Sequence, residues 1–306
     1  MRITVSGLLN IETTVAVRGF PINYYPIDYP FFGVNSAVSG VGYNIAKALH
    51  TLSDEVHLLS FLGGDDEGDR VLTQLSRDGI SADGIFRPLQ STPTSVVLYD
   101  PDGRRQIYCD LKDIQEQRIG PEAVHERLLA SDLAAICNIN FNRELIKAAR
   151  EWGITTATDV HVLSDIDDDY NRDFMENADI LFLSDEKLPC GPQDFVRRLR
   201  DRYGNRIIVL GMGGDGAMLF DGTAGRLYHL SACEDVRVVN TVGAGDALFS
   251  AFLHYYAKGC TPLDALKHAE VFAALKIGHN GASKGFSTEA KVEKFLNTVN
   301  ISVKEL

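Results

Sequence analysis

Apolar and polar positions follow two different periods along this chain. Short runs of β-branched and other apolar residues indicate buried strands, and longer stretches with apolar residues three and four positions apart indicate helices between them. The expected strands are Ile3–Ser6, Val56–Phe61, Ala134–Ile139, Thr155–Asp159, Ile180–Leu183 and Ile207–Leu210. The expected helices are Val41–Leu52, Asp69–Arg77, Asn142–Trp152, Gln193–Tyr203 and most of the chain from Asp246 onward. This alternation predicts an α/β fold with a mainly parallel central sheet covered by helices on both faces.

Two segments interrupt the alternation. Residues 15–39 are rich in Pro, Tyr and Phe, and residues 94–110 alternate apolar and polar positions around Asp102-Gly103. Because Asp-Gly between alternating runs is typical of a hairpin, we expect both segments to form a small sheet that projects from the main one, over approximately residues 13–38 and 94–112. The alternative is a pair of surface hairpins without a role. The sequence contains no repeat or linker, so residues 1–306 are expected to form a single domain.

The overall charge and the cysteines restrict the partners and the compartment. A net charge of -12 argues against binding of nucleic acid or anionic membranes, although backbone N–H groups can bind phosphate without net positive charge. No apolar run of about 18 residues predicts a membrane helix, and no leader segment is apparent. The five cysteines are an odd number without close pairs, which indicates reduced thiols and a cytoplasmic protein.

The most informative stretch is a Gly-Ala-Gly turn at residues 243–245. The valines at 238 and 239 predict a strand that runs into this turn, and a strongly apolar helix follows it. The small residues Gly243, Ala244 and Gly245 let the backbone approach a ligand, and the start of a helix favours an anion such as a transferring phosphoryl group. Asp246, in the first turn of the helix, is suited to accept a proton from an attacking hydroxyl. The alternative is that Asp246 only caps the helix.

This turn is part of a pattern that extends over nearly the whole chain. Thr241 to Asp246 before an apolar helix resembles the C-terminal signature of the ribokinase, or PfkB, carbohydrate kinase family. Four other segments resemble the glycine-rich motifs of the family, in the same order: 39–46, 64–68, 213–217 and 280–282. Each motif is weak by itself. Five in the expected order, in a chain of typical length, are a specific signal.

The resemblance implies a ribokinase-like fold with a small β-sheet lid and transfer of the ATP γ-phosphoryl group to an alcohol, expected to be primary. By position, Asp246 matches the catalytic base, and Gly243, Ala244 and Gly245 match the anion hole. Mg²⁺ is expected to bridge the phosphates of ATP, and no residue is assigned as a metal ligand. An exposed lid face also predicts a homodimer formed through the lid.

On the acceptor side, Gly7 to Glu12 resembles the first strand of the family, which ends in a carboxylate that binds sugar hydroxyls. Here that carboxylate is Glu12, which reaches one methylene further than the usual Asp. Asn10, Gly40 and Asn44 complete the predicted acceptor side, although Asn44 is equally suited to cap a helix.

Other features leave the acceptor open. Val41 stands where ribokinases proper often carry Lys, which weakens the prediction of a ribose kinase. The Tyr and Phe residues between 24 and 32 are suited to stack on a nucleobase or cover a sugar, or to pack within the lid or a dimer. Sugars and nucleosides therefore both remain candidate acceptors.

The nucleotide side shows two departures from the family pattern. Its predicted residues are Ser184, Lys187, Gly213, Asp215, Gly216 and Asn280. Lys187 replaces a Glu tied to magnesium and phosphate, so Asp185 or Glu186 substitutes, Lys187 contacts phosphate directly, or activity is impaired. Asn240 replaces an Asp that helps to hold K⁺ in activated members. Because an amide oxygen ligates a cation more weakly than a carboxylate, we do not expect activation by K⁺.

One histidine and two other classes of function also need an interpretation. His161 follows Asp159 at the end of an expected strand, and a surface or packing role is favoured for it over contact with substrate. A dinucleotide oxidoreductase is disfavoured because Gly40-x-Gly42 lies far beyond the first strand and lacks a third glycine. A non-catalytic relative is supported by the residues at 187 and 240 but opposed by the intact turn before Asp246.

Overall fold

The computed structural model describes residues 1–234 and 236–306, and in these residues the central sheet has ten strands. From one edge to the other, the strands are β5 (Ile85–Leu89), β4 (Glu55–Gly63), β1 (Arg2–Ser6), β8 (Leu133–Ile136), β9 (Thr156–Val162), β10 (Ile180–Ser184), β11 (Ile207–Gly211), β12 (Ala217–Asp221), β13 (Arg226–Leu230) and β14 (Val303–Glu305). The strands from β5 to β11 pair in parallel, and the last three extend the sheet in antiparallel fashion. The predicted α/β fold with a mainly parallel sheet is confirmed.

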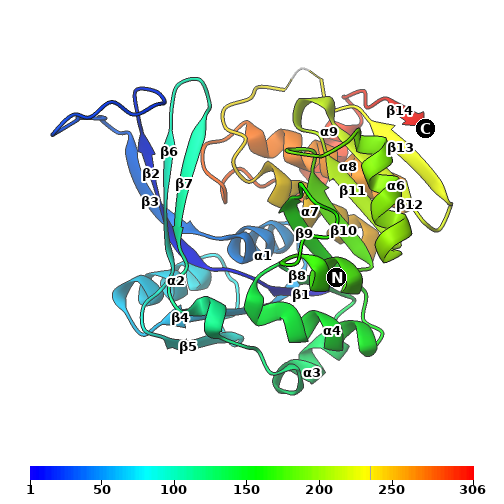
Figure 1. The fold of residues 1–306 in the computed structure, drawn as a ribbon, viewed down its shortest axis with the longest axis horizontal. Coiled ribbons are helices and arrows are strands. Elements are labelled where there is room, and N and C mark those ends of the chain that lie inside the picture. The colour runs from blue at the N-terminus through cyan, green and yellow to red at the C-terminus, as the bar shows by residue number, and fades with distance from the viewer. Residues whose placement is uncertain (235) are drawn as a thin grey trace.

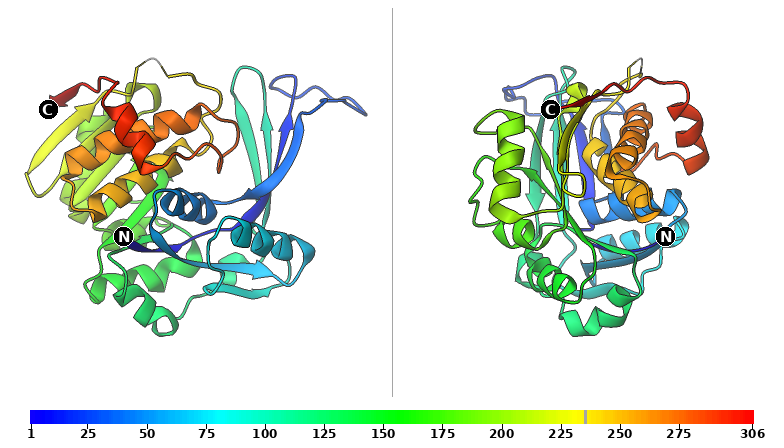
Figure 2. Two further views of the ribbon diagram at one scale, coloured as in Figure 1. Left: turned by 180° about the vertical axis from the view of Figure 1, so that it is seen from behind. Right: turned by 90° about the vertical axis from the view of Figure 1, so that its right-hand side faces the viewer.

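Helices cover both faces of this sheet (Figures 1 and 2). One layer holds α1 (Val41–Thr51), α2 (Asp66–Arg77), α7 (Ala244–Ala257), α8 (Pro262–Ile277) and α9 (Glu289–Leu296). The other holds α3 (Pro121–Leu129), α4 (Arg143–Glu151), α5 (Arg172–Asn177) and α6 (Pro192–Tyr203). Within the described ranges, no helix is long and apolar enough to cross a membrane.

The strand sequences follow from burial on both faces. In β10, Phe182 packs into the core beneath α7, whereas Leu181 and Leu183 pack into the core on the opposite face. Since successive side chains of a strand point to opposite faces, a strand covered on both sides needs a continuous apolar run. This is the reason the short apolar runs predicted the central strands well.

A second sheet of four strands projects from the main body (Figures 1 and 2). We call it the lid. It holds β3 (Val34–Ser39), β2 (Asn10–Ala16), β6 (Thr94–Tyr99) and β7 (Arg105–Asp110), in that order. The predicted hairpin turn joins β6 to β7, where Gly103 has a φ of 82° and its N–H donates to the carbonyl of Asp100 at 3.1 Å. The left-handed backbone explains the glycine at this turn.

Two local predictions were wrong. Residues 238–240 do not form a strand: Val238 and Val239 are exposed, and the N–H groups of Val239 and Asn240 donate to the carbonyl of Ile277 at 2.8 and 3.1 Å. These bonds to the end of α8 take the place of a strand ladder. Glu12 does not end the first strand, because β1 stops at Ser6 and the chain crosses into lid strand β2.

The 64–68 motif is explained by its structural role. Asp65 caps α2: its carboxylate accepts from the N–H of Gly68 at 3.0 Å. The same carboxylate accepts from the N–H and the hydroxyl of Thr92, at 2.7 and 2.6 Å. Asp65 therefore ties the start of α2 to the segment that leads into lid strand β6, and an acidic cap is favoured at a helix start.

Candidate active site

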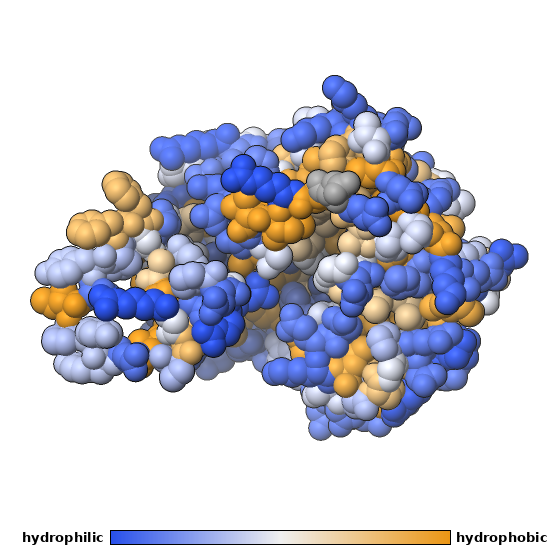
Figure 3. All heavy atoms as spheres, turned by 90° about the horizontal axis from the view of Figure 1, so that it is seen from above, coloured by the Kyte–Doolittle hydropathy of each residue, from blue (hydrophilic) through white to orange (hydrophobic). Residues whose placement is uncertain are grey.

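A cleft of about 620 Å³ lies between the lid and the carboxyl edge of the central sheet. Seen from above, the molecule is hollowed between these two parts (Figure 3). The lining comes from lid strands β2, β6 and β7, the start of α1, the ends of β9, β10 and β11, and the turn before α7. The carboxyl edge of an open parallel sheet is where such folds place their ligands.

The Gly-Ala-Gly turn forms one wall of the cleft. Gly243 has a φ of 79° and precedes α7, and a Cβ added there would lie 2.5 Å from the carbonyl oxygen of Ala282. Both facts require glycine at this position. Ala244 and Gly245 begin α7 and also line the cleft. The N–H of Ala244 donates to the carbonyl of Thr241 at 3.1 Å, whereas those of Gly243 and Gly245, at the open start of the helix, have no backbone partner among the described residues. This wall is suited to bind an anion.

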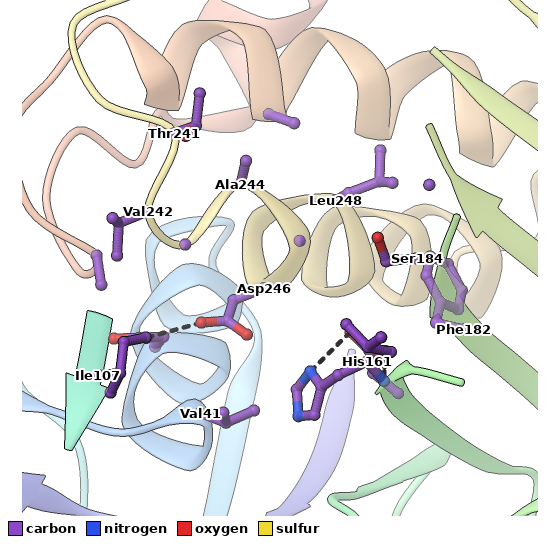
Figure 4. Close-up of a pocket in the computed structure, with 18 of the residues that line it drawn as sticks. Val41, Ile107, His161, Phe182, Ser184, Thr241, Val242, Ala244, Asp246 and Leu248 are labelled. Carbon is purple, nitrogen blue, oxygen red and sulfur yellow. Dashed lines mark hydrogen bonds and ion pairs between the residues drawn. The ribbon is translucent and has the colours of Figure 1, made fainter. Parts of the chain in front are cut away.

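Asp246 extends from the first turn of α7 into the cleft (Figure 4). Its carboxylate accepts a hydrogen bond from the side-chain amide of Asn44 at 2.7 Å. Burial raises the pKa of Asp246, against the lowering effects of the Asn44 hydrogen bond and the nearby His161. A raised pKa makes the carboxylate a stronger base than an exposed aspartate.

The predicted acceptor residues meet beside Asp246. Asn10 and Glu12 reach the cleft from β2, and Gly40 and Asn44 line it at the start of α1. Burial raises the pKa of Glu12. The amide oxygens of Asn10 and Asn44 are buried and have no hydrogen-bond partner among the described residues. Buried polar atoms are nearly always paired, so these two oxygens are suited to accept bonds from the hydroxyls of a ligand.

The predicted nucleotide residues divide into two groups. Ser184, Gly213 and Gly216 line the far end of the cleft. Lys187, Asp215 and Asn280 are not among the lining residues: Lys187 is exposed, the Asp215 carbonyl bonds the ring of His229 at 2.9 Å, and Asn280 accepts from Asn240 at 2.8 Å. Of the alternatives left open at 185–187, the structure places Glu186 on the cleft wall.

The family model described as pfkB family carbohydrate kinase matches residues 2–289. The chain belongs to the pfkB family of carbohydrate kinases. The family resemblance and the ribokinase-like fold predicted from the sequence are thereby confirmed.

Relatives of this pfkB family kinase act on different sugars. An ATP-dependent ribose-1-phosphate kinase from Halopiger xanaduensis is 29% identical over 269 residues, which cover 84% of this chain and 86% of that protein. An acarbose 7(IV)-phosphotransferase from Actinoplanes is 25% identical, with coverage of 84% and 85%. Among solved structures, a microbiome-derived acarbose kinase superposes with a TM-score of 0.85 at 24% identity, over 97% of this chain and 98% of that one. The nucleoside kinase of Methanocaldococcus jannaschii has a TM-score of 0.79 at 18% identity, with coverage of 97% and 98%.

The sequence did not single out several residues on the cleft of this pfkB family kinase. His161, for which a surface or packing role was favoured, is an exposed residue that lines the cleft at the end of β9 (Figure 4). Arg105, Ile107 and Cys109 line it from β7. These three positions alternate along the hairpin, and the period of two was the signal that pointed to a shared face. Which face meets the cleft depends on how the lid is placed.

Proposed function

We propose that this kinase transfers the γ-phosphoryl group of ATP to a hydroxyl, expected to be primary, of a small sugar or sugar derivative. The whole chain acts as a single kinase domain, and Asp246 is the general base. One observation carries the proposal: a single cleft joins the acceptor residues of β2 and α1 to the nucleotide residues after β10 and β11, with Asp246 and the Gly-Ala-Gly turn between them. This order is the one that in-line transfer requires.

In the proposed reaction, Asp246 takes the proton of the acceptor hydroxyl. The oxygen then forms a bond to the γ-phosphorus while the bond from phosphorus to the β-phosphate oxygen breaks, which releases ADP. The N–H groups at the start of α7 stabilise the charge on the transferring oxygens. Asn44 holds the Asp246 carboxylate in place, and Asn10, Glu12 and Asn44 orient the acceptor. Closure of the lid would exclude water.

ATP is expected to bring a magnesium ion. The described residues hold no group of three or more His, Cys, Asp or Glu side chains arranged for a metal. The ion would therefore take most of its ligands from phosphate and water, with Glu186 as a carboxylate on the same side of the cleft. Bound there, it would neutralise phosphate charge.

Arg105 supports an acceptor that carries an anionic group. It lines the cleft from β7, near Glu12 and on the acceptor side, and its guanidinium forms no ion pair within the described part of the chain. A guanidinium binds phosphate through charge-assisted hydrogen bonds. The ribose-1-phosphate kinase among the relatives supports the same class of acceptor. By contrast, the aromatic residues between 24 and 32 are not among those that line the cleft, which disfavours stacking on a nucleobase.

The decisive experiment measures ADP release from Mg·ATP over pentoses, hexoses, their phosphates and nucleosides, with and without K⁺. We expect a sugar phosphate to give the highest kcat/KM. Arg105→Gln should raise KM for that acceptor roughly 10-fold or more, because a hydrogen bond to a charged group contributes about 1.5–3 kcal/mol. Arg104→Gln is the matched control, because Arg104 pairs with Asp100 instead. Turnover of a nucleoside alone would favour the alternative acceptor, and ATP binding without any turnover would favour a non-catalytic relative.

We also propose that the kinase forms a homodimer through the lid. Large side chains are exposed in the segment that joins lid strands β2 and β3, including Tyr24, Phe31 and Phe32 at 88%, 86% and 102%. Apolar residues stand among hydrophilic ones at this outer end of the molecule (Figure 3). Burial of this area in a second copy would remove it from water. Light scattering after gel filtration should give a mass of two chains for the wild type. A Phe31→Ser, Phe32→Ser double variant should give the mass of one chain, 33.7 kDa. A monomeric wild type would refute the dimer.

All five cysteines are free thiols. We propose that the kinase works in the cytoplasm, a reducing compartment in which thiols stay unpaired.

A further inference from the structure

A lysine ammonium lies buried behind the Gly-Ala-Gly turn. Lys276 is in the last turn of α8 and has an exposed fraction of 0%. Its Nζ donates to the carbonyl of Val242, the residue directly before Gly243. Burying an ammonium is costly, so a fully buried lysine needs a partner that repays the lost hydration. The proposed reaction so far gives this charge no role.

The end of α8 holds the whole segment that leads into the turn. The N–H groups of Val239 and Asn240 donate to the carbonyl of Ile277, and the N–H of Val242 donates to the side chain of Asn240 at 2.8 Å. Lys276 bonds the Val242 carbonyl, which belongs to the next peptide unit, the one that carries the N–H of Gly243. Two consecutive peptide units before Gly243 are therefore held by side chains, and the contact to the second of them carries a full charge.

The charged groups that face Lys276 come from three other elements. Asp246 of α7 and Glu12 of β2 attract the ammonium, and Arg105 of β7 repels it. The two carboxylates are the proposed base and a proposed acceptor ligand. Lys276 thus connects the anion turn electrostatically with both groups that handle the acceptor.

We propose that Lys276 is a positioning residue for phosphoryl transfer, whose ammonium is a built-in cation that fixes the Val242 carbonyl and adds positive charge behind the anion turn. This inference rests on the proposed function. The fixed carbonyl keeps the N–H groups of Gly243 and Gly245 in place for the moment when charge develops on the transferring group. The N–H of Ala244 is already bonded to the carbonyl of Thr241 at 3.1 Å. The charge also favours the ionised form of Asp246.

The ammonium of Lys276 should lose its proton within the pH range over which the kinase reaction is measured. Burial lowers the pKa of Lys276 to about 8, while Asp246 and Glu12 oppose that shift. A lysine is charged below its pKa, so the built-in cation is present at pH 7 and is lost as the pH rises through about 8. We therefore expect kcat to fall as the pH rises through this range, and we call this fall the alkaline limb of the pH profile.

The test compares Lys276→Met, Lys276→Ala and wild type on the best acceptor. Lys276→Met keeps the apolar length of the side chain but not its charge. We expect this variant to have a kcat roughly 10- to 100-fold lower than wild type, with little change in KM for the acceptor. Its pH profile should lack the alkaline limb. Propylammonium should restore part of the kcat of Lys276→Ala, whereas tetramethylammonium, which has no N–H, should not. A merely structural lysine would give neither the changed pH profile nor the selective rescue.

Two controls separate the outcomes. Glu270 also lines the cleft, and burial raises its pKa to about 8, so Glu270→Gln must keep the alkaline limb if Lys276 is its source. Wild-type kcat and an unchanged limb in Lys276→Met would overturn the inference while leaving the proposed function intact. If the wild type turns over no acceptor, the proposed function fails instead, and the affinity for ATP is then measured by calorimetry. An ATP affinity at least tenfold lower in folded Lys276→Met than in wild type supports the inference. An unchanged ATP affinity overturns it.

Discussion

Replacing Asp246 with asparagine should lower kcat by about 10²-fold or more, the contribution expected of a general base. An asparagine side chain has the same shape and still has an oxygen to accept the 2.7 Å hydrogen bond from Asn44. It cannot take the proton of the acceptor hydroxyl. The substitution therefore removes the proton transfer and leaves the wall of the cleft unchanged, so ATP binding should be preserved. Steady-state ADP release with saturating acceptor measures the loss directly.

The pH dependence of the reaction provides a second readout for Asp246. A base works only when it is deprotonated, and burial raises the pKa of Asp246 above the usual range of aspartate. Wild-type kcat should therefore fall as the pH decreases through that raised pKa, at a higher pH than an exposed aspartate would cause. The residual activity of Asp246→Asn should lack this acidic limb.

The alternative role of Asp246 as a simple helix cap has its own control. Asp264 occupies the first turn of α8, where its N–H and carboxylate both bond Thr261. Asp264→Asn should change the free energy of unfolding by about 1 kcal/mol or less and leave kcat unchanged. If Asp246→Asn shows the same small effect and retains near wild-type turnover, Asp246 is a cap and the assignment of the base fails.

Replacing Gly243 with alanine should lower kcat/KM for ATP roughly 100-fold, the loss typical when an anion-binding donor is removed. The substitution has two physical costs. Alanine is strained at the observed φ of 79°, and its methyl group would lie 2.5 Å from the carbonyl oxygen of Ala282. The backbone of both loops must move apart, which turns the N–H groups at the start of α7 away from the phosphate. Initial rates over a range of ATP concentrations give kcat/KM.

Gly225→Ala separates strain from misalignment. Gly225 also has a positive φ, 67°, but its added methyl group would meet no atom within 4 Å, and the residue lies between β12 and β13, outside the cleft lining. It should lose about 1 kcal/mol of stability, as alanine does in left-handed backbone, and keep full activity. Equal kinetics for the two variants would show that the Gly243 turn takes no part in binding the phosphates.

Local sequence patterns predicted most of the central fold. The apolar runs at 180–183 and 207–210 match β10 and β11 closely, since strands buried on both faces need continuous apolar sequence. The pattern failed at 238–239, where two valines suggested a strand. Strand propensity takes effect only where a neighbouring strand supplies hydrogen bonds, and here the backbone bonds the end of α8. Likewise, no pattern in the short segments of β12, β13 and β14 predicted that these strands would extend the sheet.

The sequence by itself determined the fold class, the family and the residues of the Gly-Ala-Gly turn, because strand period, glycine conformation and helix capping act over a few neighbouring positions. Only the tertiary structure decided which distant side chains meet. It brought Asn44 to Asp246 across 202 positions, placed His161 and Arg105 on the cleft and left Lys187 outside its lining. It also buried Lys276 behind Val242. Such encounters depend on how the lid and α8 pack against the sheet, and no local pattern in the chain specifies that packing.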